Sequence, residues 1–498
     1  MQPEFEVLRS EELGRYGVAS RDLKAGEILH TETPMVVGPK QDSAVVCLGC
    51  NIFLDGTSAG PRCSTCGWPL CPECDDSQAP LHRAECRVFA KNRVKFQNLP
   101  KEAMVCLQLD CITPLRLLLA KEADPQRWEQ EVAHMEYHEE ARKQTQTWKV
   151  DDTNIVKYLR GPCKLTRFPE ALIQQACGIL EVNAFEAHTV SGNPVRCVFP
   201  KLAIFAHSCV PNLTHSISLD GTFRMDCRAA VDIPKGGMLY TTYTFTLTGT
   251  KERQVHLRRG KYFTCHCPRC VDPTELGTFF SSPKCTSCSE GYLISTDPLE
   301  ASSPWLCTSC KISTPFAQIS EFLTKIEEDI AALKAKPVSR TKLIEAEKLF
   351  KHYLTFLHPN HYLLVTFREL LIEMLGHVEG CGLNGLPEIL LQHKIHLIQG
   401  VLTILDTFEP GMTRARAMML FELHAPLAVL ARKLFFGKKI TASAFRERLQ
   451  EAASAVGQAY EVLKWEDCRL SEGVLASICK NTHTQLLNDI ADITEEEE

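Results

Sequence analysis

The residues best suited to chemistry in this chain are cysteines in closely spaced pairs. The 498 residues include 24 cysteines, and most of them precede residue 311. The N-terminus lacks the basic and apolar regions of a secretory signal, so we expect a reducing compartment, the cytoplasm or the nucleus or both. Disulfides are rare there, and Cys-x-x-Cys pairs serve as metal ligands. The sequence therefore predicts structural zinc sites.

The first cysteine block, residues 47–86, supplies complete ligand sets for two zinc ions. Its candidate ligands are Cys47, Cys50, Cys63, Cys66, Cys71, Cys74, His82 and Cys86. Seven thiols and one imidazole fill two four-coordinate sites and leave no open position, which makes the sites structural rather than catalytic. So short a segment buries little core, whereas a structural zinc contributes about 10–16 kcal/mol of binding energy. The spacing permits either sequential or cross-braced pairing.

A second block, residues 265–310, predicts two further sites. Three closely spaced thiols need a fourth ligand from elsewhere, for which the best candidate lies near residue 209, and two later Cys-x-x-Cys pairs form a zinc-ribbon pattern. The candidate ligands are Cys209, Cys265, Cys267 and Cys270 for one site, and Cys285, Cys288, Cys307 and Cys310 for the other. We therefore expect about four structural zinc ions.

The elements that must position these ligands change in type along the chain. Residues 1–44 and 183–260 favour short strands, including a hairpin that turns at Asp220-Gly221. Residues 95–180 read mainly as helix, because apolar residues recur at helical spacing around Val105–Leu109 and Leu115–Leu119.

From about residue 316 onward the apolar pattern is helical. Apolar residues recur every three to four positions over 343–357 and again over 445–463, and His358-Pro-Asn360 breaks the first of these helices. Paired antiparallel helices of this kind indicate a solenoid-like module. In the strand-rich part, Arg21–Leu29 and Val231–Leu239 share a Gly-containing turn before an apolar run. This shared pattern is explained equally well by two structurally related turns and by two unrelated turns that each precede a strand.

Composition excludes several classes of function. The formal net charge is −6, with 44% hydrophobic and 23% charged residues, so no global basic field draws the chain to nucleic acid. The cysteine blocks also lack the spacing of DNA-binding Cys2His2 fingers. No apolar stretch reaches about 18 residues, so we expect no membrane span.

Several motifs together resemble one family. Phe205-Ala-His-Ser-Cys-Val-Pro-Asn212 resembles the SET-domain signature Asn-His-Ser-Cys-x-Pro-Asn, and Leu239-Tyr-Thr-Thr-Tyr243 follows it. Lys261-Tyr-Phe-Thr-Cys-His-Cys-Pro-Arg-Cys270 resembles a post-SET zinc motif, and the first block resembles a MYND finger that ends in His82-Arg-Ala-Glu-Cys86. In this order, the motifs resemble the SET–MYND protein-lysine methyltransferases.

The resemblance covers essentially the whole chain. The zinc-ribbon pair, Leu357–His361 and Glu422–Pro426 look most like arthropod members. It implies an α+β, multidomain fold with a β-rich SET core and a C-terminal helical, TPR-like domain. The expected parts are the SET N-terminal part (1–44), MYND finger (45–88), helical SET insert (89–180), SET core (181–262), post-SET and zinc-ribbon-like segment (263–315) and C-terminal helical domain (316–498).

The resemblance also implies how the zinc ligands are grouped. In the MYND finger it implies a cross-brace, with Cys47, Cys50, Cys71 and Cys74 on one zinc and Cys63, Cys66, His82 and Cys86 on the other. Cys71 and Cys74 are spaced by two residues, where the family usually has three. In the SET core, zinc would tie Cys209 to the post-SET cysteines and fasten a threaded loop around the cofactor pocket.

The cofactor implied by the resemblance is S-adenosylmethionine, and the catalytic residue is Tyr243. Its hydroxyl would orient a neutral lysine amine about 3–3.5 Å from the transferring methyl carbon. The implied cofactor-binding residues are Gly14, Arg15, Tyr16, Gly17, Asn183, Ala206, His207 and Phe263, with Lys261 as a further contact. Gly14 to Gly17 would form a turn close to the cofactor, and Phe263 would pack on the adenine.

The implied function is protein-lysine N-methyltransfer to a histone or a non-histone protein by a monomer. Ala206 stands where the signature has asparagine, and the lost hydrogen bond to a charged group costs about 1.5–3 kcal/mol. This departure motivates an alternative, a catalytically weak or inactive adaptor that binds partners through its helical domain and proline-containing peptides through its finger.

Overall fold

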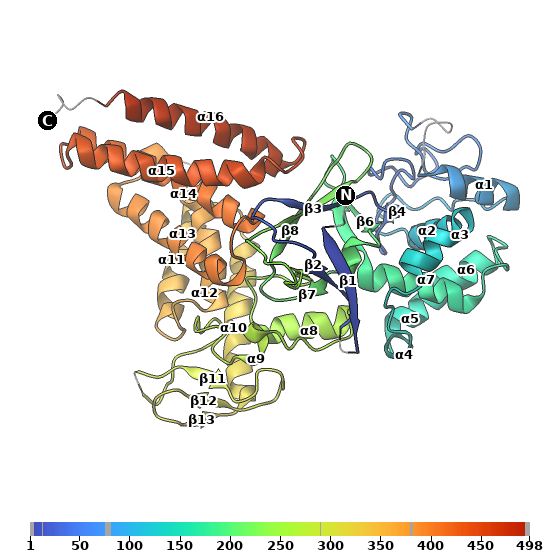
Figure 1. The fold of residues 1–498 in the computed structure, drawn as a ribbon, viewed down its shortest axis with the longest axis horizontal. Helices are drawn as coiled ribbons and strands as arrows, with labels where there is room; N and C mark the ends of the chain where they lie inside the picture. Colours follow the sequence, from blue (N-terminus) through green and yellow to red (C-terminus); the bar gives the residue numbers. More distant parts are fainter. Residues whose placement is uncertain (1–3, 12, 75–80, 289, 379–381, 494–498) are drawn as a thin grey trace.

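Short strands from distant parts of the sequence form the centre of the structure (Figure 1). The computed structural model describes residues 4–11, 13–74, 81–288, 290–378 and 382–493. The two-stranded pairs are β1 (Phe5–Ser10) with β2 (Gly14–Ala19), antiparallel, and β7 (Ala206–His207) with β10 (Tyr240–Thr241), parallel. The predicted strands of residues 1–44 are therefore present.

Two antiparallel three-stranded sheets lie beside these pairs. In the first, β9 (Met225–Ala229) is the central strand between β3 (Ile28–Glu32) and β8 (Leu213–Ile217). In the second, β6 (Pro194–Val198) lies between β4 (Val36–Pro39) and β5 (Phe185–His188). The predicted hairpin is confirmed, because β8 and β9 flank Asp220-Gly221 and Gly221 has the positive φ of +91° that a tight reversal requires.

The two segments that echo each other in sequence lie side by side. Leu23 and Ile233 exchange backbone hydrogen bonds of 2.8 and 2.9 Å, and Lys24 forms an ion pair with Asp232. Gly26 has a φ of +85° and the corresponding glycine of the second turn, at position 236, has +78°. The two turns are therefore matched in conformation and pair with each other.

The helices between residues 83 and 183 pack on one side of the strands (Figure 1). They are α1 (Arg83–Asn92), η1 (Leu107–Cys111), α2 (Ile112–Ala123), α3 (Pro125–Arg127), η2 (Trp128–Val132), α4 (Glu139–Arg142), α5 (Gln146–Asp151), η3 (Asp152–Val156), α6 (Lys157–Arg160) and α7 (Glu170–Asn183). α2 is central, because its residues from Ile112 to Leu118 are buried and it packs against β4 and α7.

Residues 95–180 are mainly helical, as predicted, but no regular α-helix forms around Val105–Leu109. The backbone there is extended and then forms the short 3-10 helix η1, and the side chains of Val105 and Leu107 are exposed. The Gln108 side chain instead bonds to the backbone of Gln97 and Lys95, which holds a loop. The apolar residues at helical spacing thus do not share one buried face. The second predicted position, Leu115–Leu119, does lie in α2.

On the other side of the strands, successive helices pack against one another to the C-terminal end (Figure 1). They are α10 (Phe316–Lys334), α11 (Arg340–Leu354), α12 (Tyr362–Met374), η5 (Leu383–Gly385), α13 (Glu388–Phe408), α14 (Arg414–Phe436), α15 (Ala442–Leu463) and α16 (Ser471–Ala491). The predicted break at 358–360 separates α11 from α12, and the apolar positions of 445–463 form the buried stripe of α15.

The remaining elements lie between α7 and α10 in the sequence. They are η4 (Leu202–Ile204), α8 (Thr250–Gly260), α9 (Pro268–Val271), β11 (Leu293–Ser295), β12 (Trp305–Cys307) and β13 (Ser313–Thr314). The α+β, multidomain fold class predicted from the sequence is confirmed by this arrangement and by its cysteine clusters. Among the described helices, none combines the length and the apolar character that crossing a bilayer requires.

Candidate functional site

Four groups of ligand atoms converge within the described part of the chain. In each group, the atoms lie within 4.8 Å of one another. The groups are Cys47, Cys50, Cys71 and Cys74; Cys63, Cys66, His82 and Cys86; Cys209, Cys265, Cys267 and Cys270; and Cys285, Cys288, Cys307 and Cys310. In the finger this is the cross-braced grouping, with Cys71 and Cys74 on the same site despite their shorter spacing.

The sulfur spacing tests whether these groups fit zinc. A tetrahedral ion with Zn–S bonds of about 2.3 Å places its sulfur ligands about 3.8 Å apart. The Sγ–Sγ distance is 3.7 Å for Cys50–Cys71 and for Cys63–Cys86. It is 3.5 Å in the third group and 3.6 to 3.7 Å in the fourth. Each donor set therefore has the size and the chemistry that structural zinc requires.

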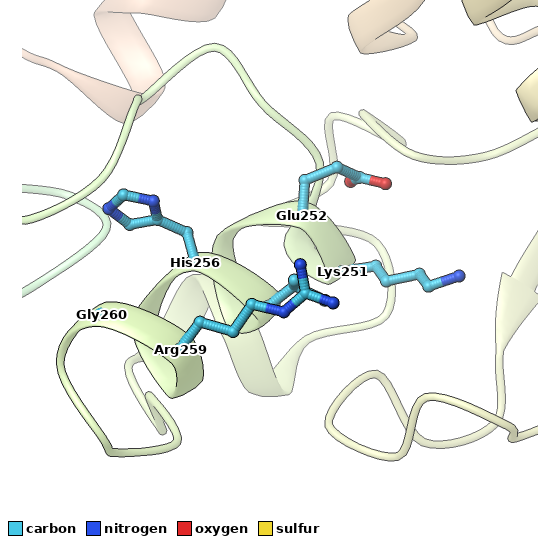
Figure 2. A pocket seen from close by; sticks show the side chains of 6 residues that line it. Lys251, Glu252, His256, Arg259 and Gly260 are labelled. Carbon is cyan, nitrogen blue, oxygen red and sulfur yellow. The ribbon is translucent and has the colours of Figure 1, made fainter. Parts of the chain in front are cut away.

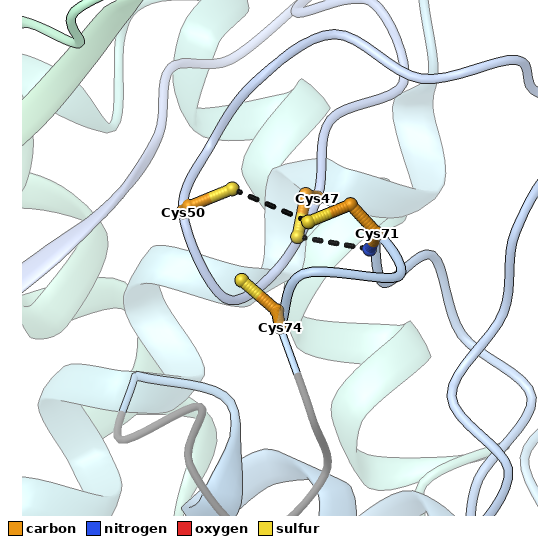
Figure 3. Close-up of side chains that lie close together, drawn as sticks. All are labelled: Cys47, Cys50, Cys71 and Cys74. Carbon is orange, nitrogen blue, oxygen red and sulfur yellow. Dashed lines mark hydrogen bonds between the residues drawn. The ribbon is translucent and has the colours of Figure 1, made fainter.

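Backbone N–H groups point at the thiol sulfurs in the first group. The Cys71 N–H donates to Cys47 Sγ at 3.2 Å (Figure 3). The Gly49 N–H donates to the same sulfur at 3.3 Å. Such bonds favour the charged thiolate, which is the form that binds metal. The two loops thus supply the sulfur ligands, and their backbone N–H groups partly compensate the negative charge of the Cys47 thiolate.

In the second group, the histidine is oriented by a buried carboxylate. His82 Nε2 lies 3.3 Å from Cys66 Sγ, while Nδ1 lies 3.3 Å from Glu85 Oε1. Glu85 also accepts from Arg116 Nε at 3.0 Å, and Arg116 donates to the carbonyls of Val37 and Leu48. Burial opposes ionisation of Glu85, but the Arg116 and His82 contacts outweigh it and lower the pKa of this carboxyl.

A carboxylate on the second ring nitrogen of a zinc histidine fixes the ring and raises its basicity. Arg116 lies on α2, so it joins the second finger site to the strand β4 and to the first site at Leu48. Neither Glu85 nor Arg116 was identified from the sequence as part of the site. Glu85 stands inside the His82–Cys86 motif and could have been found there, whereas Arg116 is distant in sequence.

The third group ties two distant segments together. Cys209 follows β7, whereas its three partners follow α8. Arg253 on α8 donates to Cys209 Sγ at 3.2 Å and to Cys270 Sγ at 3.6 Å, and its charge offsets that of the thiolates. Arg253 also pairs with the buried Glu275 at 3.0 Å. Sequence reasoning did not identify this arginine.

The fourth group lies in the small sheet β11–β12–β13. Trp305 and Leu293 form its apolar core, which packs against Ile319 on α10. This module therefore connects the second cysteine block to the first C-terminal helix.

The SET signature segment runs parallel to the segment that carries Tyr243. Ala206 pairs with Tyr240, and His207 pairs with Thr241. Asn212 closes the arrangement, since its Nδ2 donates to the Met238 carbonyl and its Oδ1 accepts from the Tyr240 N–H, both at 2.8 Å. Together with the Cys209 group, these contacts hold residues 206–212 between residues 238–243 and the segment that carries Cys265, Cys267 and Cys270.

Tyr243 is held by three polar contacts. Its hydroxyl donates to the Phe205 carbonyl at 2.5 Å, its N–H donates to His207 Nδ1 at 3.0 Å, and its carbonyl lies 3.1 Å from His256 Nε2. Burial raises the pKa of Tyr243 to about 12, so the phenol keeps its proton at neutral pH. Burial lowers the pKa of His207 to about 4, so its imidazole is neutral and Nδ1 can accept.

The structure brings together several residues assigned to the cofactor. The His207 ring lies 5.2 Å from the Tyr243 ring and 5.9 Å from the Phe263 ring, measured between centroids. Asn183 ends α7, and its Nδ2 donates to the carbonyls of Glu136 and Ile179. Both amide hydrogens are therefore used, which leaves Oδ1 as an acceptor.

The predicted turn at Gly14 to Gly17 is wrong. Gly14 opens β2 with a φ of +64°, and Arg15, Tyr16 and Gly17 continue the strand opposite β1. The reversal of the chain precedes Gly14. Gly17 is nevertheless constrained, because a Cβ there would lie 2.9 Å from the Phe205 ring. β2 therefore packs directly on the residue whose carbonyl accepts from Tyr243.

A hollow of about 500 Å³ runs along the outer face of α8 (Figure 2). Its lining residues are Lys251, Glu252, Val255, His256, Arg259 and Gly260. Through its contact with the Tyr243 carbonyl, His256 connects this surface to the site.

Residues 206–212 lie beside Tyr243 and are held there by strand pairing and by the Cys209 group, the arrangement expected of a SET-domain protein with an inserted cysteine–histidine finger. SET domain-containing protein SmydA-8, isoform A, from Drosophila melanogaster is 32% identical over 333 residues, which cover 64% of this chain and 68% of that protein. N-lysine methyltransferase SMYD2 from Homo sapiens is 35% identical over 74 residues, 15% of this chain and 16% of that protein.

A solved structure of the SET domain of LSMT bound to lysine and AdoHcy aligns with a TM-score of 0.33 and 11% identity, over 97% of this chain and 88% of that chain. No protein-family model matches the chain. The similarity to SmydA-8 shows that the chain belongs to the SET and MYND domain-containing protein family, as an arthropod-type member.

Proposed function

We propose that this chain is an S-adenosylmethionine-dependent protein-lysine N-methyltransferase acting on histone or non-histone proteins. The observation that carries the proposal is the fixing of Tyr243 by Phe205 and His207, with the Phe263 ring alongside. The name of the SMYD2 relative, an N-lysine methyltransferase, supports the same reaction class.

The residues present fit the cofactor chemically. Asn183 keeps an amide oxygen that can accept from the ammonium group of the methionine part, and Phe263 offers an aromatic face for the adenine. Gly14, Arg15, Tyr16 and Gly17, together with Ala206 and His207, would line the rest of the pocket. When bound, the cofactor supplies an electrophilic methyl group.

The residues of the chain contribute by positioning the substrate lysine amine. The Tyr243 hydroxyl already donates its hydrogen to Phe205, so its oxygen is free to accept from an incoming lysine amine. The raised pKa of Tyr243 means that it does not remove a proton, and the substrate ammonium must lose its proton before transfer. The buried site favours the neutral amine by desolvation.

The four zinc groups support this role by holding segments in register. Cys209 would hold the signature segment, and the finger ligands would hold residues 47–86. Since every proposed zinc has four protein ligands, these ions are structural.

Ala206 favours a second candidate, a non-catalytic adaptor. It lies on β7 and is half-buried at the site, and its methyl group cannot replace the hydrogen bonds of an amide. In that case partner proteins would bind the helical domain and proline-containing peptides would bind the finger.

One pair of measurements separates the two candidates. Calorimetric titration of the zinc-loaded chain with S-adenosylmethionine should detect binding, and a labelled methyl-transfer assay on a protein array should detect labelled lysines. Tyr243→Phe should bind the cofactor and lose the label. A folded, zinc-loaded chain without cofactor binding would reject the methyltransferase and favour the adaptor.

A further inference from the structure

One lysine amine lies inside the proposed active site. Lys261 directly follows α8, and its Nζ donates to the Val182 carbonyl at 2.5 Å. The same Nζ lies 5.6 Å from the centroid of the Tyr243 ring. Val182 directly precedes Asn183, which is assigned to the cofactor. The Lys261 amine therefore lies between this end of α7 and Tyr243, the residue assigned to orient the lysine substrate.

The surroundings of this amine favour its neutral form. Burial lowers the pKa of Lys261 to about 8, and only Glu181 opposes the shift. Glu181 is itself engaged, because it accepts from Arg142 Nε at 2.7 Å and from the Tyr262 hydroxyl. The uncharged amine, which is the state that methyl transfer needs, is therefore more accessible at Lys261 than at an exposed lysine.

We propose that Lys261 is a methyl acceptor in its own molecule, which rests on the methyltransferase function proposed above. The lone pair of the neutral Nζ forms a bond to the sulfonium methyl of S-adenosylmethionine. The carbon–sulfur bond breaks, and its electron pair stays on sulfur as the thioether of S-adenosylhomocysteine. The methylated ammonium then loses a proton to solvent.

The chain supplies a matched lysine for comparison. Lys251 lies at the other end of α8 and also contacts an aromatic ring, with its Nζ 3.7 Å from the Phe316 centroid. That contact lies toward α10, and Lys251 lines the outer hollow. Among the described lysines, Lys261 is the one whose Nζ lies over the Tyr243 ring.

A purely structural role for Lys261 is the competing explanation. In that case the amine would only join the end of α8 to the end of α7 through Val182. A structural contact adds no mass to the protein, so mass spectrometry distinguishes the two.

The test uses the full zinc-loaded chain with S-adenosylmethionine that carries a deuterated methyl group, and no other protein. We expect one or more labelled methyl groups on the peptide that contains Lys261. The labelled fraction at a given time should not change when the protein is diluted at constant cofactor, because the transfer is intramolecular. Lys251→Arg should keep this label, whereas Lys261→Arg and Tyr243→Phe should lose it.

The possible outcomes are separable from those of the proposed function. Array proteins labelled by a chain whose own Lys261 stays unlabelled would overturn this proposal alone. Label on Lys261 that falls on dilution would show transfer between molecules and would also overturn it. Failure to bind the cofactor would reject both proposals.

Discussion

Removing the guanidinium of Arg116 tests whether the finger depends on a buried carboxylate. Arg116 and Glu85 form an ion pair whose side chains are 5% and 0% exposed. Arg116→Met keeps the bulk of the stem but leaves the Glu85 charge without its partner, and removes the donors to the Val37 and Leu48 carbonyls.

The expected loss follows from this burial. Removing one partner of a buried ion pair typically costs about 3–5 kcal/mol, because the remaining charge is left uncompensated. The change also disturbs the carboxylate that orients His82, and loss of such a contact weakens metal binding about 10–100-fold. Both effects should appear at the second finger site.

The assay is urea unfolding of the zinc-loaded chain. The quantity measured at each urea concentration is the zinc released to a chromophoric chelator. Arg116→Met should release zinc at a clearly lower urea concentration and should bind zinc more weakly at equilibrium. Glu85→Gln should do the same, because it leaves the buried guanidinium unpaired.

The control is an exposed ion pair between two segments that are also distant in sequence. Lys24 and Asp232 are joined at 2.8 Å, but their side chains are 77% and 61% exposed, so solvent screens the attraction. Lys24→Met should leave zinc release unchanged. If Arg116→Met behaves like Lys24→Met, the finger does not depend on the buried Arg116–Glu85 pair.

Three further changes test other parts of the site. Cys209→Ser should lower the zinc content of the intact chain by one ion in native mass spectrometry. It should also abolish cofactor binding, because residues 206–212 are then no longer held by the third zinc group. Unchanged zinc content would contradict this. Gly17→Ala should destabilise the chain by about 1–3 kcal/mol, because its Cβ would lie 2.9 Å from the Phe205 ring, and an unchanged thermal midpoint would refute the close approach. Self-methylation of Lys261 should speed up as pH rises through about 8 and then level off, since burial lowers the pKa of Lys261 to about 8 and the amine loses its proton there, while the raised pKa of Tyr243 keeps the phenol protonated. A rate that falls over this range would exclude the neutral amine as nucleophile.

The sequence by itself determined the zinc ligands as candidates and the general order of the elements. Cys-x-x-Cys spacing is a local property, because two thiols on one turn face the same ion wherever the turn lies. The strands of the N-terminal part and the apolar stripe of α15 also follow from short-range periodicity.

Local pattern failed where it had no information about burial. Val105 and Leu109 are four residues apart, a helical spacing, but Val105 is exposed whereas Leu109 is buried, so the two do not share one buried face. Gly14 and Gly17 suggested a turn, yet strand pairing with β1 extends the backbone between them. In both cases tertiary contacts decided the conformation against a weak local preference.

Only the tertiary structure showed the contacts that tune the site. Arg116 reaches Glu85, Arg253 reaches Cys209, and Lys261 reaches Val182, across separations of 31, 44 and 79 residues. Spacing along a chain carries no signal for such pairs, because the distance between their side chains is set by how the helices α2, α7 and α8 pack. The residue types that bind metal could thus be read from the sequence. The positions of the Arg116 and Arg253 charges beside the metal ligands, and of the Lys261 amine beside Tyr243, depended on the folded arrangement.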